Sequence, residues 1–277
     1  MEGDHIKRSY ERHALILSLL QANEFVAIET MASACNTSTQ TIRRDLAVLS
    51  KEGKVQRYHG GARLPTNAAG PTYEIRSARN VPEKIAACEL LPDLIPDGSS
   101  LFLAGGSTLA LAAKSLLRKT RLTIVTNNLH AAVTFYNKEG FDVHVVGGWL
   151  RTASGSLVGD RTAEALQPFS LDFAVISTRG ITADGYLLEY DQSLVGPVAA
   201  MLSNSREKIV IADNSKFRST GIIRAAHLRD IDHLLTNEPV SGDTEQMLQR
   251  YGVKLHVPEV GADIPKRRNA AAGSARA

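Results

Sequence analysis

Apolar residues recur at helical spacing near the start of the chain, which predicts a small helical domain there. Residues 5–22 carry one apolar face, formed by Ile6, Tyr10, Ala14, Leu17 and Leu20. The segment EFVAI follows as a short extended piece, and ETMASAC then reads as a second, short helix. Asn36 is a turn residue that tolerates left-handed backbone geometry.

A third helix is predicted from the next segment. Thr37 or Ser38 is a suitable N-cap, and Gly53 is a suitable C-terminal stop after about residue 52. The inward face consists of Ile42, Leu46 and Leu49. The segment KVQRYHGGARL then predicts two short strands around a Gly-Gly turn, so the whole pattern indicates a winged helix-turn-helix.

Beyond this domain, the pattern changes to strands that alternate with helices. Seven apolar segments are strand candidates: SLFLA, LTIVT, DVHVVG, DFAVIS, KIVIAD, HLLTN and VKLHV. Helical patterns such as TLALAAKSLL and NLHAAVTFY separate several of them, and SLVGPVAAML is a third. This alternation predicts an α/β domain built on a parallel sheet that helices cover on both faces.

The expected domain boundaries follow from these patterns. The winged helix-turn-helix covers residues 8–63, with its helix-turn-helix core at about 26–45, and an aperiodic segment, 64–80, is expected to be a linker. The α/β domain covers 81–257, and a basic tail, 258–277, is expected to be disordered.

Composition and charge narrow the function classes. The chain has 277 residues, no apolar run long enough to span a membrane, and a charged N-terminus without a secretory pattern, so a cytoplasmic protein is expected. Cys35 and Cys88 lack metal-ligand spacing. The net charge is only +3, but residues 38–63 contain six basic residues against two acidic ones, which predicts a positive patch for nucleic acid.

The third helix and the wing are therefore predicted to bind double-stranded DNA. In a helix-turn-helix, the N-terminal residues of the recognition helix meet base edges, glutamine can pair with adenine, and arginine can pair with guanine. An alternative is that Arg43 and Arg44 form a solvated face with Asp45 as their acidic partner. The candidate DNA-binding residues are Ser38, Thr39, Gln40, Thr41, Arg43, Arg44, Arg57 and His59.

A second candidate site lies in the α/β domain. LFLAGGSTLALA reads as a strand, a glycine turn and a helix start, which can hold an anion on free helix amides. Taken alone, this could be an ordinary strand-to-helix turn. Polar residues also follow four other strands, and ligands of parallel sheets bind at the carboxyl ends of the strands. The candidate effector-binding residues are Gly106, Ser107, Thr108, Asn127, Gly147, Gly148, Ser177, Gly180, Asp191, Asp213 and Lys216. No cofactor or metal site is expected.

The segment TQTIRRDLAVLSKEGKVQRYHGGARLP resembles the recognition helix and wing of the DeoR family of bacterial transcriptional regulators. The resemblance covers about residues 8–257. It implies a repressor with a C-terminal sugar-phosphate sensor domain related in fold to ribose-5-phosphate isomerase, and a homo-oligomer that a phosphorylated effector releases from operator DNA. The family's phosphate turn corresponds to Gly106, Ser107 and Thr108, and its D-x-S-K segment to Asp213, Ser215 and Lys216. Within the family, the segments IVTNNL and DGYLLEYD look most like regulators of glycerol-3-phosphate metabolism, and this resemblance implies glycerol-3-phosphate as the effector.

The chain departs from the family pattern at two places. The family usually has an aspartate just before the phosphate turn, where this chain has Ala104. Gly196, Pro197 and Val198 stand where the family carries charged residues. Two alternatives to an effector-released repressor therefore remain: a regulator that has lost its ligand response, and a sugar-phosphate isomerase. An isomerase could use Glu189, Asp184 or Asp191 as a base, but the segment lacks the lysine expected near them.

Overall fold

The computed structural model describes residues 12–20, 26–58, 60–63, 73–219 and 221–259. His59, the first residues of the predicted first helix, residues 64–72 of the predicted linker and most of the predicted tail lie outside this range. No helix in the described ranges is long and apolar enough to cross a membrane.

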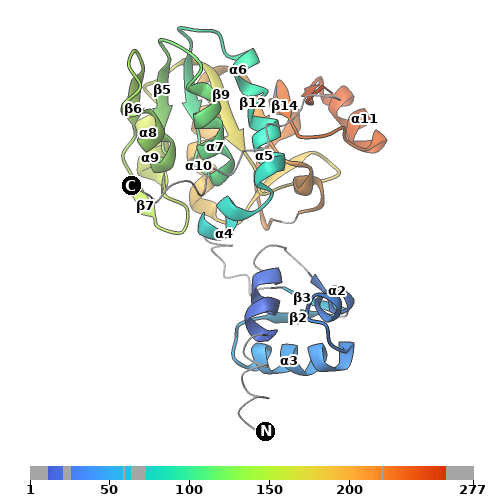
Figure 1. The fold of residues 1–277 in the computed structure, drawn as a ribbon. Coiled ribbons are helices and arrows are strands. Elements are labelled where there is room, and N and C mark those ends of the chain that lie inside the picture. Colours follow the sequence, from blue (N-terminus) through green and yellow to red (C-terminus); the bar gives the residue numbers. More distant parts are fainter. Residues whose placement is uncertain (1–11, 21–25, 59, 64–72, 220, 260–277) are drawn as a thin grey trace, which may run out of the picture.

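The N-terminal part of the chain is a winged helix with a core of its own (Figure 1). Residues 12–20 are helical and precede β1 (Val26–Ala27), α2 (Ile28–Ala34), α3 (Thr39–Lys51), β2 (Gln56–Tyr58) and β3 (Gly61–Arg63). The strands form an antiparallel sheet in the order β1-β3-β2. The buried face of α3 is Ile42, Leu46 and Leu49, as its spacing predicted.

Local signals set the two ends of α3. Asn36 adopts the left-handed conformation, with φ at 47°. The Ser38 hydroxyl then caps the helix by accepting the Thr41 amide at 3.2 Å. At the other end, Gly53 takes a φ of 70°, which ends the helix after Lys51.

The C-terminal part contains a parallel sheet of seven strands, as the alternating pattern predicted. The strands are β4 (Ser100–Leu103), β5 (Thr123–Thr126), β6 (Asp142–Val145), β9 (Leu171–Ser177), β12 (Ser205–Ile211), β14 (His233–Leu235) and β15 (Lys254–His256). Their order is β15-β14-β12-β9-β4-β5-β6, and every neighbouring pair is parallel. The chain moves outward from β4 to β6, then returns to β9 on the other side of β4. This is the Rossmann-like strand order, with its switch point between β4 and β9.

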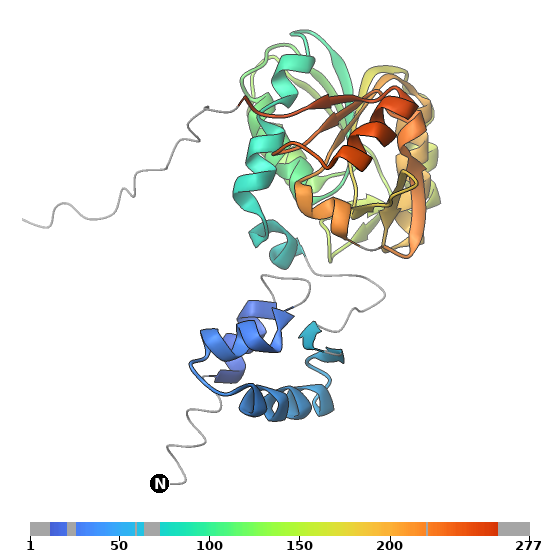
Figure 2. The same ribbon diagram turned by 90° about the vertical axis from the view of Figure 1, so that its right-hand side faces the viewer.

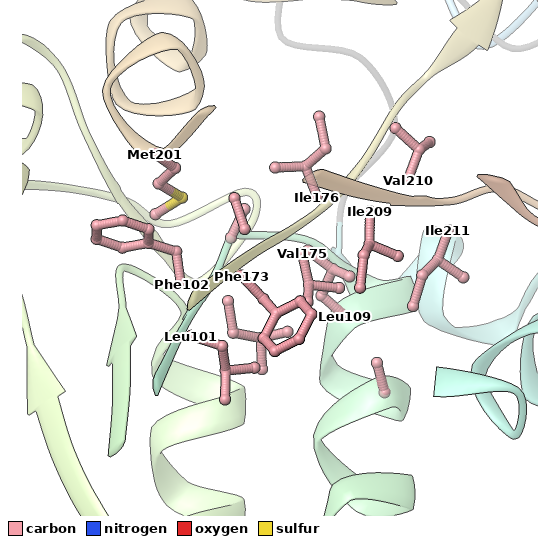
Figure 3. Packing of buried hydrophobic residues seen from close by; sticks show 14 of the residues in the cluster. Leu101, Phe102, Leu109, Phe173, Val175, Ile176, Met201, Ile209, Val210 and Ile211 are labelled. Atoms are coloured by element: carbon pink, nitrogen blue, oxygen red, sulfur yellow. The ribbon is translucent and has the colours of Figure 1, made fainter. Parts of the chain in front are cut away.

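Helices pack on both sides of this sheet. One group contains α5 (Val81–Cys88), α6 (Leu91–Leu94), α7 (Ser107–Leu116) and α8 (Leu129–Phe135), while α9 (Asp160–Leu166) packs against α10 (Val195–Ser203). Figure 3 shows Met201 of α10 beside Phe102, with Leu101 and Leu109 on the opposite side of the strand. Neighbouring strand residues thus face opposite layers, and both layers are apolar. The last helix, α11 (Gly242–Tyr251), lies between β14 and β15 in the chain, towards the right in Figure 1.

Two small antiparallel units follow the carboxyl ends of the main strands, and the sequence pattern did not predict them. A hairpin joins β7 (Trp149–Arg151) to β8 (Ser156–Val158). A second sheet contains β10 (Gly180–Ile181), β11 (Tyr186–Glu189) and β13 (Ile223–His227). Short 3-10 turns, η1 (Gln192–Leu194), η2 (Asn214–Arg218) and η3 (Leu228–Asp230), complete these connections.

The segment predicted to be a linker contains a helix, α4 (Tyr73–Ala78), which packs against α7. In Figure 2, α4 lies at the lower edge of the α/β part, and α5 follows it up the left-hand side (both teal). Asn80 joins this segment to η2 by donating to Asp213 Oδ1 at 3.1 Å and to Ser215 Oγ at 3.0 Å. The buried ammonium of Lys84 donates to the Arg76 carbonyl. Residues 73–80 are therefore structured against the α/β part, although their sequence has no clear period.

Candidate functional site

A cavity of about 790 Å³ lies at the switch point of the main sheet. Its walls include the turn after β4, from Ala104 to Thr108, and the end of β9, from Ser177 to Arg179. Because the connections from β4 and β9 leave the sheet in opposite directions, a space opens between them, and this is where ligands of such folds bind. The volume is within the range of small-molecule sites.

The turn after β4 needs glycine at both of its positions. Gly106 has a φ of 130°, a conformation that L side chains rarely adopt, and a Cβ at Gly105 would lie 2.4 Å from Ser156 Oγ. Helix α7 begins directly after the turn, at Ser107. Its first amides have no partner within the helix, so they and the Ser107 and Thr108 hydroxyls can hold an anion.

Six of the eleven residues predicted for effector binding line this cavity: Gly106, Ser107, Thr108, Asn127, Ser177 and Lys216. Two more support the wall from behind. Asp213 is fully buried, with Oδ2 3.6 Å from the Lys216 ammonium, and Asp191 pairs with Arg151 at 2.9 Å.

The other three predicted residues, Gly147, Gly148 and Gly180, do not line the cavity. A Cβ at Gly148 would lie 1.8 Å from Thr162 Oγ1, and a Cβ at Gly180 would lie 2.5 Å from the Ser219 carbonyl oxygen. The Gly147 carbonyl accepts the Thr162 hydroxyl at 3.0 Å. Gly148 and Gly180 therefore serve close packing, which a sequence reading cannot distinguish from contact with a ligand, whereas a Cβ at Gly147 would meet no atom within 4 Å.

Asn127 offers the ligand an acceptor. Its Nδ2 donates to the Leu157 carbonyl at 2.8 Å, which fixes the orientation of the amide. Its Oδ1 is buried and has no hydrogen-bond partner within the described ranges. A buried acceptor without a partner is costly, so a ligand hydroxyl or an ordered water is expected to donate to it. The next residue, Asn128, instead holds the turn in place by donating to the Ala104 and Gly106 carbonyls at 3.2 Å each.

A set of basic residues, which we call the cationic wall, lines the cavity and was mostly missed by the sequence reading. Only Lys216 was predicted. The cationic wall consists of Arg76, Arg79, Lys84, Arg151, Arg179, Lys216 and Arg218. The available signal was the density of basic residues in EIRSARNVPEK, with Arg76 and Arg79 three positions apart. That segment was assigned to a linker, so its charges were not considered for the site.

The half-buried carboxyl group of Glu189 lines the same cavity as these cations. Burial raises the pKa of Glu189 to about 7, although the charges of Arg76, Arg179 and Lys216 act in the opposite direction. Burial also lowers the pKa of Lys84 to about 8, with a further contribution from Lys216. The chain around Glu189 has no lysine, but Lys216 of η2 lines the same cavity as Glu189. Asp184, by contrast, does not line the cavity.

The positions where the chain departs from the family pattern form an apolar side of the cavity. Ala104 and Val198 line it, together with Leu194, Pro197 and Met201. Pro197 is the third residue of α10, where its missing N–H would have had no partner within the helix. Gly196 does not line the cavity. The proline is therefore compatible with the helix, and the charges of the site come from other elements.

The second candidate site is the outer face of α3. Arg43, Arg44 and Gln40 are exposed on it, while Ser38 and Thr41 form the cap, and Thr39 is partly buried beside them. Arg57 is exposed on β2 of the wing. Neither Arg43 nor Arg44 makes an ion pair within the described ranges.

Asp45 is not the partner of these arginines. It is buried, and it accepts from Arg12 Nε at 2.5 Å, from Arg12 Nη2 at 2.9 Å and lies 3.1 Å from His13 Nε2. The alternative in which Asp45 is the acidic partner of Arg43 and Arg44 is therefore wrong, because Asp45 pairs with Arg12. Asp45 ties the first helix to α3, and Arg43 and Arg44 are left without an acidic partner within the described ranges.

Comparisons with known proteins agree with this organisation. The DeoR-like helix-turn-helix domain matches residues 12–68, and the DeoR C terminal sensor domain matches residues 79–238. The glycerol-3-phosphate regulon repressor of Escherichia coli K12 is 34% identical over 247 residues, which cover 89% of this chain and 98% of that protein. The glycerol-3-phosphate regulon repressor of Haemophilus influenzae is 36% identical, and the match covers 83% of this chain and 90% of that protein. The repressor GlcR of Bacillus subtilis is 31% identical, and the match covers 90% of this chain and 96% of that protein.

Among solved structures, a ribose 5-phosphate isomerase from Methanocaldococcus jannaschii is similar to this chain, with a TM-score of 0.38 and 17% sequence identity. The match covers 50% of this chain and 54% of the isomerase. The two matched domains and the curated relatives show a DNA-binding transcriptional repressor with a C-terminal α/β sensor domain. The chain belongs to the DeoR family.

Proposed function

We propose that this repressor leaves its operator DNA when a phosphorylated small molecule binds in the cavity at the switch point. The observation that carries the proposal is the Gly105–Thr108 turn, which presents free helix amides and two hydroxyls to a cavity lined by basic residues. The buried Asn127 Oδ1 adds an acceptor for a hydroxyl of the same ligand. Glycerol-3-phosphate is the first ligand to test, because relatives are named for its regulon.

We assign operator contact to the N-terminal half of α3 and to the wing. Gln40, Arg43 and Arg44 reach base edges or phosphates from the exposed face of α3, and Arg57 contacts the backbone from β2. The Ser38 and Thr41 hydroxyls lie at the helix start, where phosphate groups bind. Paired half-sites in DNA match a symmetric protein, so the working form is a homo-oligomer.

An operator-release titration tests this proposal. Operator duplexes are first selected in vitro from random DNA with the full-length protein. Binding is then followed by fluorescence anisotropy while glycerol-3-phosphate, sugar phosphates or the same compounds without phosphate are added. Release by a phosphorylated compound, and not by its unphosphorylated form, is expected. If no phosphorylated compound changes either DNA binding or the melting temperature, the protein has no phosphate-based response, and the alternative of a ligand-independent regulator stands.

A second candidate function, sugar-phosphate isomerisation, has one observation in its favour. Glu189 has a pKa of about 7, which suits a general base, and it shares the cavity with Lys216. We propose nevertheless that the domain binds without turnover, because Asp191 is held by Arg151 and Asp184 lies outside the cavity. Incubation with aldose and ketose phosphates, followed by NMR, would reveal any interconversion. Turnover that Glu189→Gln abolishes would establish an enzyme instead.

A further inference from the structure

A hydrogen bond joins the wall of the cavity to the winged helix. Arg79 lines the cavity, and its Nη2 donates to the Leu20 carbonyl at 3.1 Å, across 59 residues of chain. The Arg79 side chain is half-buried, and this burial lowers its pKa. Arg79 thus belongs both to the proposed effector site and to the contact between the two domains.

The backbone on both sides of Arg79 is held against the α/β part. Arg76 Nη2 donates to the Ala153 carbonyl at 3.3 Å, and Asn80 Nδ2 donates to Asp213 Oδ1 at 3.1 Å. Helix α4 packs against α7, which begins at the phosphate turn. Because the backbone is anchored, the long side chain of Arg79 is the part that can respond when the cavity is occupied.

The Leu20 carbonyl belongs to the first helix, which supports α3. The Leu20 side chain is fully buried in the core of the winged helix, and Ile42 of α3 belongs to the same cluster. The first helix also carries Arg12, which pairs with the buried Asp45 of α3. Figure 1 shows this helix, in the darkest blue, between α4 and α3. A shift at Leu20 therefore reaches α3 through an ion pair and through close packing, because packed cores transmit strain.

An anion in the cavity competes with the Leu20 carbonyl for Arg79. An ionised phosphate attracts a guanidinium group more strongly than a neutral carbonyl does, because both partners are charged, and the planar guanidinium fits two phosphate oxygens at once. The Gly105–Thr108 turn, which is proposed to hold such a phosphate, opens into the cavity that Arg79 lines. Binding of the effector is therefore expected to draw the Arg79 side chain away from Leu20.

We infer that Arg79 is the positioning residue through which the effector acts on α3. It holds the first helix through Leu20 when the operator is bound, and it turns to the anionic group of the effector when the cavity is occupied. A ligand shifts an equilibrium only as far as it binds the two states differently, and here the difference is the acceptor that Arg79 contacts. The inference rests on the proposed function, because it takes the effector to be a phosphorylated compound in this cavity.

The coupling between effector and operator tests the inference. The operator affinity of the full-length protein is measured by fluorescence anisotropy, first without effector and then at saturating effector. Glycerol-3-phosphate is the probe, or the phosphorylated compound that replaces it in the release titration above. The ratio of the two operator affinities is the coupling factor, which is commonly about 5- to 150-fold in allosteric proteins. Because the factor is measured at saturation, a variant that only binds the effector more weakly keeps the wild-type value.

Arg79→Ala is expected to bring the coupling factor close to one. Without effector, this variant should bind the operator about as weakly as the effector-saturated wild type does, because it lacks the contact with Leu20. Calorimetry should then give the same effector affinity with and without operator, since coupling between two sites is reciprocal. Arg79→Lys, which keeps the charge but not the planar fork, should retain part of the coupling factor.

Arg218→Gln is the matched control. Arg218 is an exposed member of the cationic wall, and it makes no hydrogen bond to the winged helix within the described ranges. The variant should need more effector to reach saturation, but its coupling factor should remain that of the wild type. Melting curves of each variant report whether it is folded.

Three results would overturn the inference: a wild-type coupling factor in folded Arg79→Ala, wild-type operator affinity of that variant without effector, or an equal loss of coupling in Arg218→Gln. Each of them leaves the proposed function intact, because the wild type is still released from its operator. If no phosphorylated compound releases the wild type, the proposed function itself fails, and the inference fails with it.

Discussion

The reading face of α3 and the sensor cavity both depend on arginine, but the two regions place it in opposite surroundings. Arg43 and Arg44 are exposed on a helix, where water and salt ions surround them. Arg76 is mostly buried, and burial lowers its pKa. Exposed cations attract any polyanion and are screened by salt. Buried cations can select one ligand, because an unmatched charge there is costly. We therefore expect arginine to supply general affinity for a polyanion on α3 and selectivity for one ligand in the cavity.

The largest expected effect comes from placing a negative charge on the phosphate turn. Ser107→Asp puts a carboxylate at the start of α7, where the ligand's phosphate is proposed to lie. A carboxylate at a helix N-terminus is tolerated by the fold, so the protein should still bind DNA. Release by effector should be lost, with a midpoint raised by more than about a hundredfold, on the order of 3 kcal/mol. Anisotropy titrations measure both properties.

Ser107→Ala is the control for that variant, since it removes one hydroxyl and keeps the helix amides. A small shift of the release midpoint is expected for it. Substitution of Gly106 would be less informative, because its φ of 130° strains any side chain. A wild-type release midpoint in Ser107→Asp would place the phosphate elsewhere in the cavity.

The next effect concerns the buried ion pair of the winged helix. Asp45→Asn leaves Arg12 partly buried without its carboxylate. Loss of one partner from a buried pair costs about 3–5 kcal/mol, and we expect about 2–4 here because Arg12 retains some exposure. Hydrogen exchange of the α3 amides in the full chain should accelerate, whereas amides of β9 should not change.

Glu52→Gln is the matched control, because it removes the exposed pair with Lys54, whose atoms lie 2.8 Å apart. Exposed pairs contribute little, so α3 exchange should remain that of the wild type. Equal exchange in both variants would show that Asp45 does not tie the first helix to α3.

The third effect is a pH dependence that belongs to the sensor domain alone. The pKa of Glu189 is raised from 4.5 to about 7, so the folded state holds this proton more tightly than the unfolded state. Its contribution is therefore intact below about pH 4.5, falls as the pH rises towards 7, and is lost above it. A shift of one pKa unit corresponds to about 1.36 kcal/mol, so the loss of unfolding free energy is on the order of 3 kcal/mol.

Glu189→Gln removes this titration, so the difference in unfolding free energy between the variant and the wild type should grow in favour of the variant between pH 5 and pH 8. Urea denaturation at several pH values measures it. An anionic ligand should raise the pKa of Glu189 further, and ligand binding near pH 7 should then take up a proton. A pH-independent difference between the two proteins would place Glu189 in contact with water.

The smallest expected effects are those of the exposed arginines. Arg43→Ala or Arg44→Ala should cost about 1–3 kcal/mol and relax specificity at one base pair if the side chain contacts a base. If it contacts a phosphate, all sequences should bind more weakly, and the salt slope should fall by about one. Neither variant should alter effector affinity measured without DNA. Unchanged operator affinity in both variants would remove α3 from the DNA interface.

Much of this organisation follows from signals that lie close together in the sequence. The Ser38 cap, the inward spacing of Ile42, Leu46 and Leu49, and the glycine after the helix specify α3 within about fifteen residues of chain. The seven apolar segments and the helices between them specify a parallel sheet, and the turn after β4 could be identified because one strand, two glycines and a helix start are adjacent. Periodicity and capping are local physics, so the sequence alone determined these features.

The composition of the cavity was decided only by tertiary structure. Asn80 meets Asp213 across 133 residues of chain, and Arg76 meets Ala153 across 77. Such contacts leave no period in the sequence. A linker-like segment therefore supplied two members of the cationic wall, Arg76 and Arg79, and Asp45 was paired with Arg12 rather than with the adjacent arginines. The same holds for Gly148 and Gly180, whose backbones are crowded by Thr162 and Ser219. Which charges face one another, and which glycines are crowded, depends on how distant elements pack, because desolvation and steric contact act through space and not along the chain.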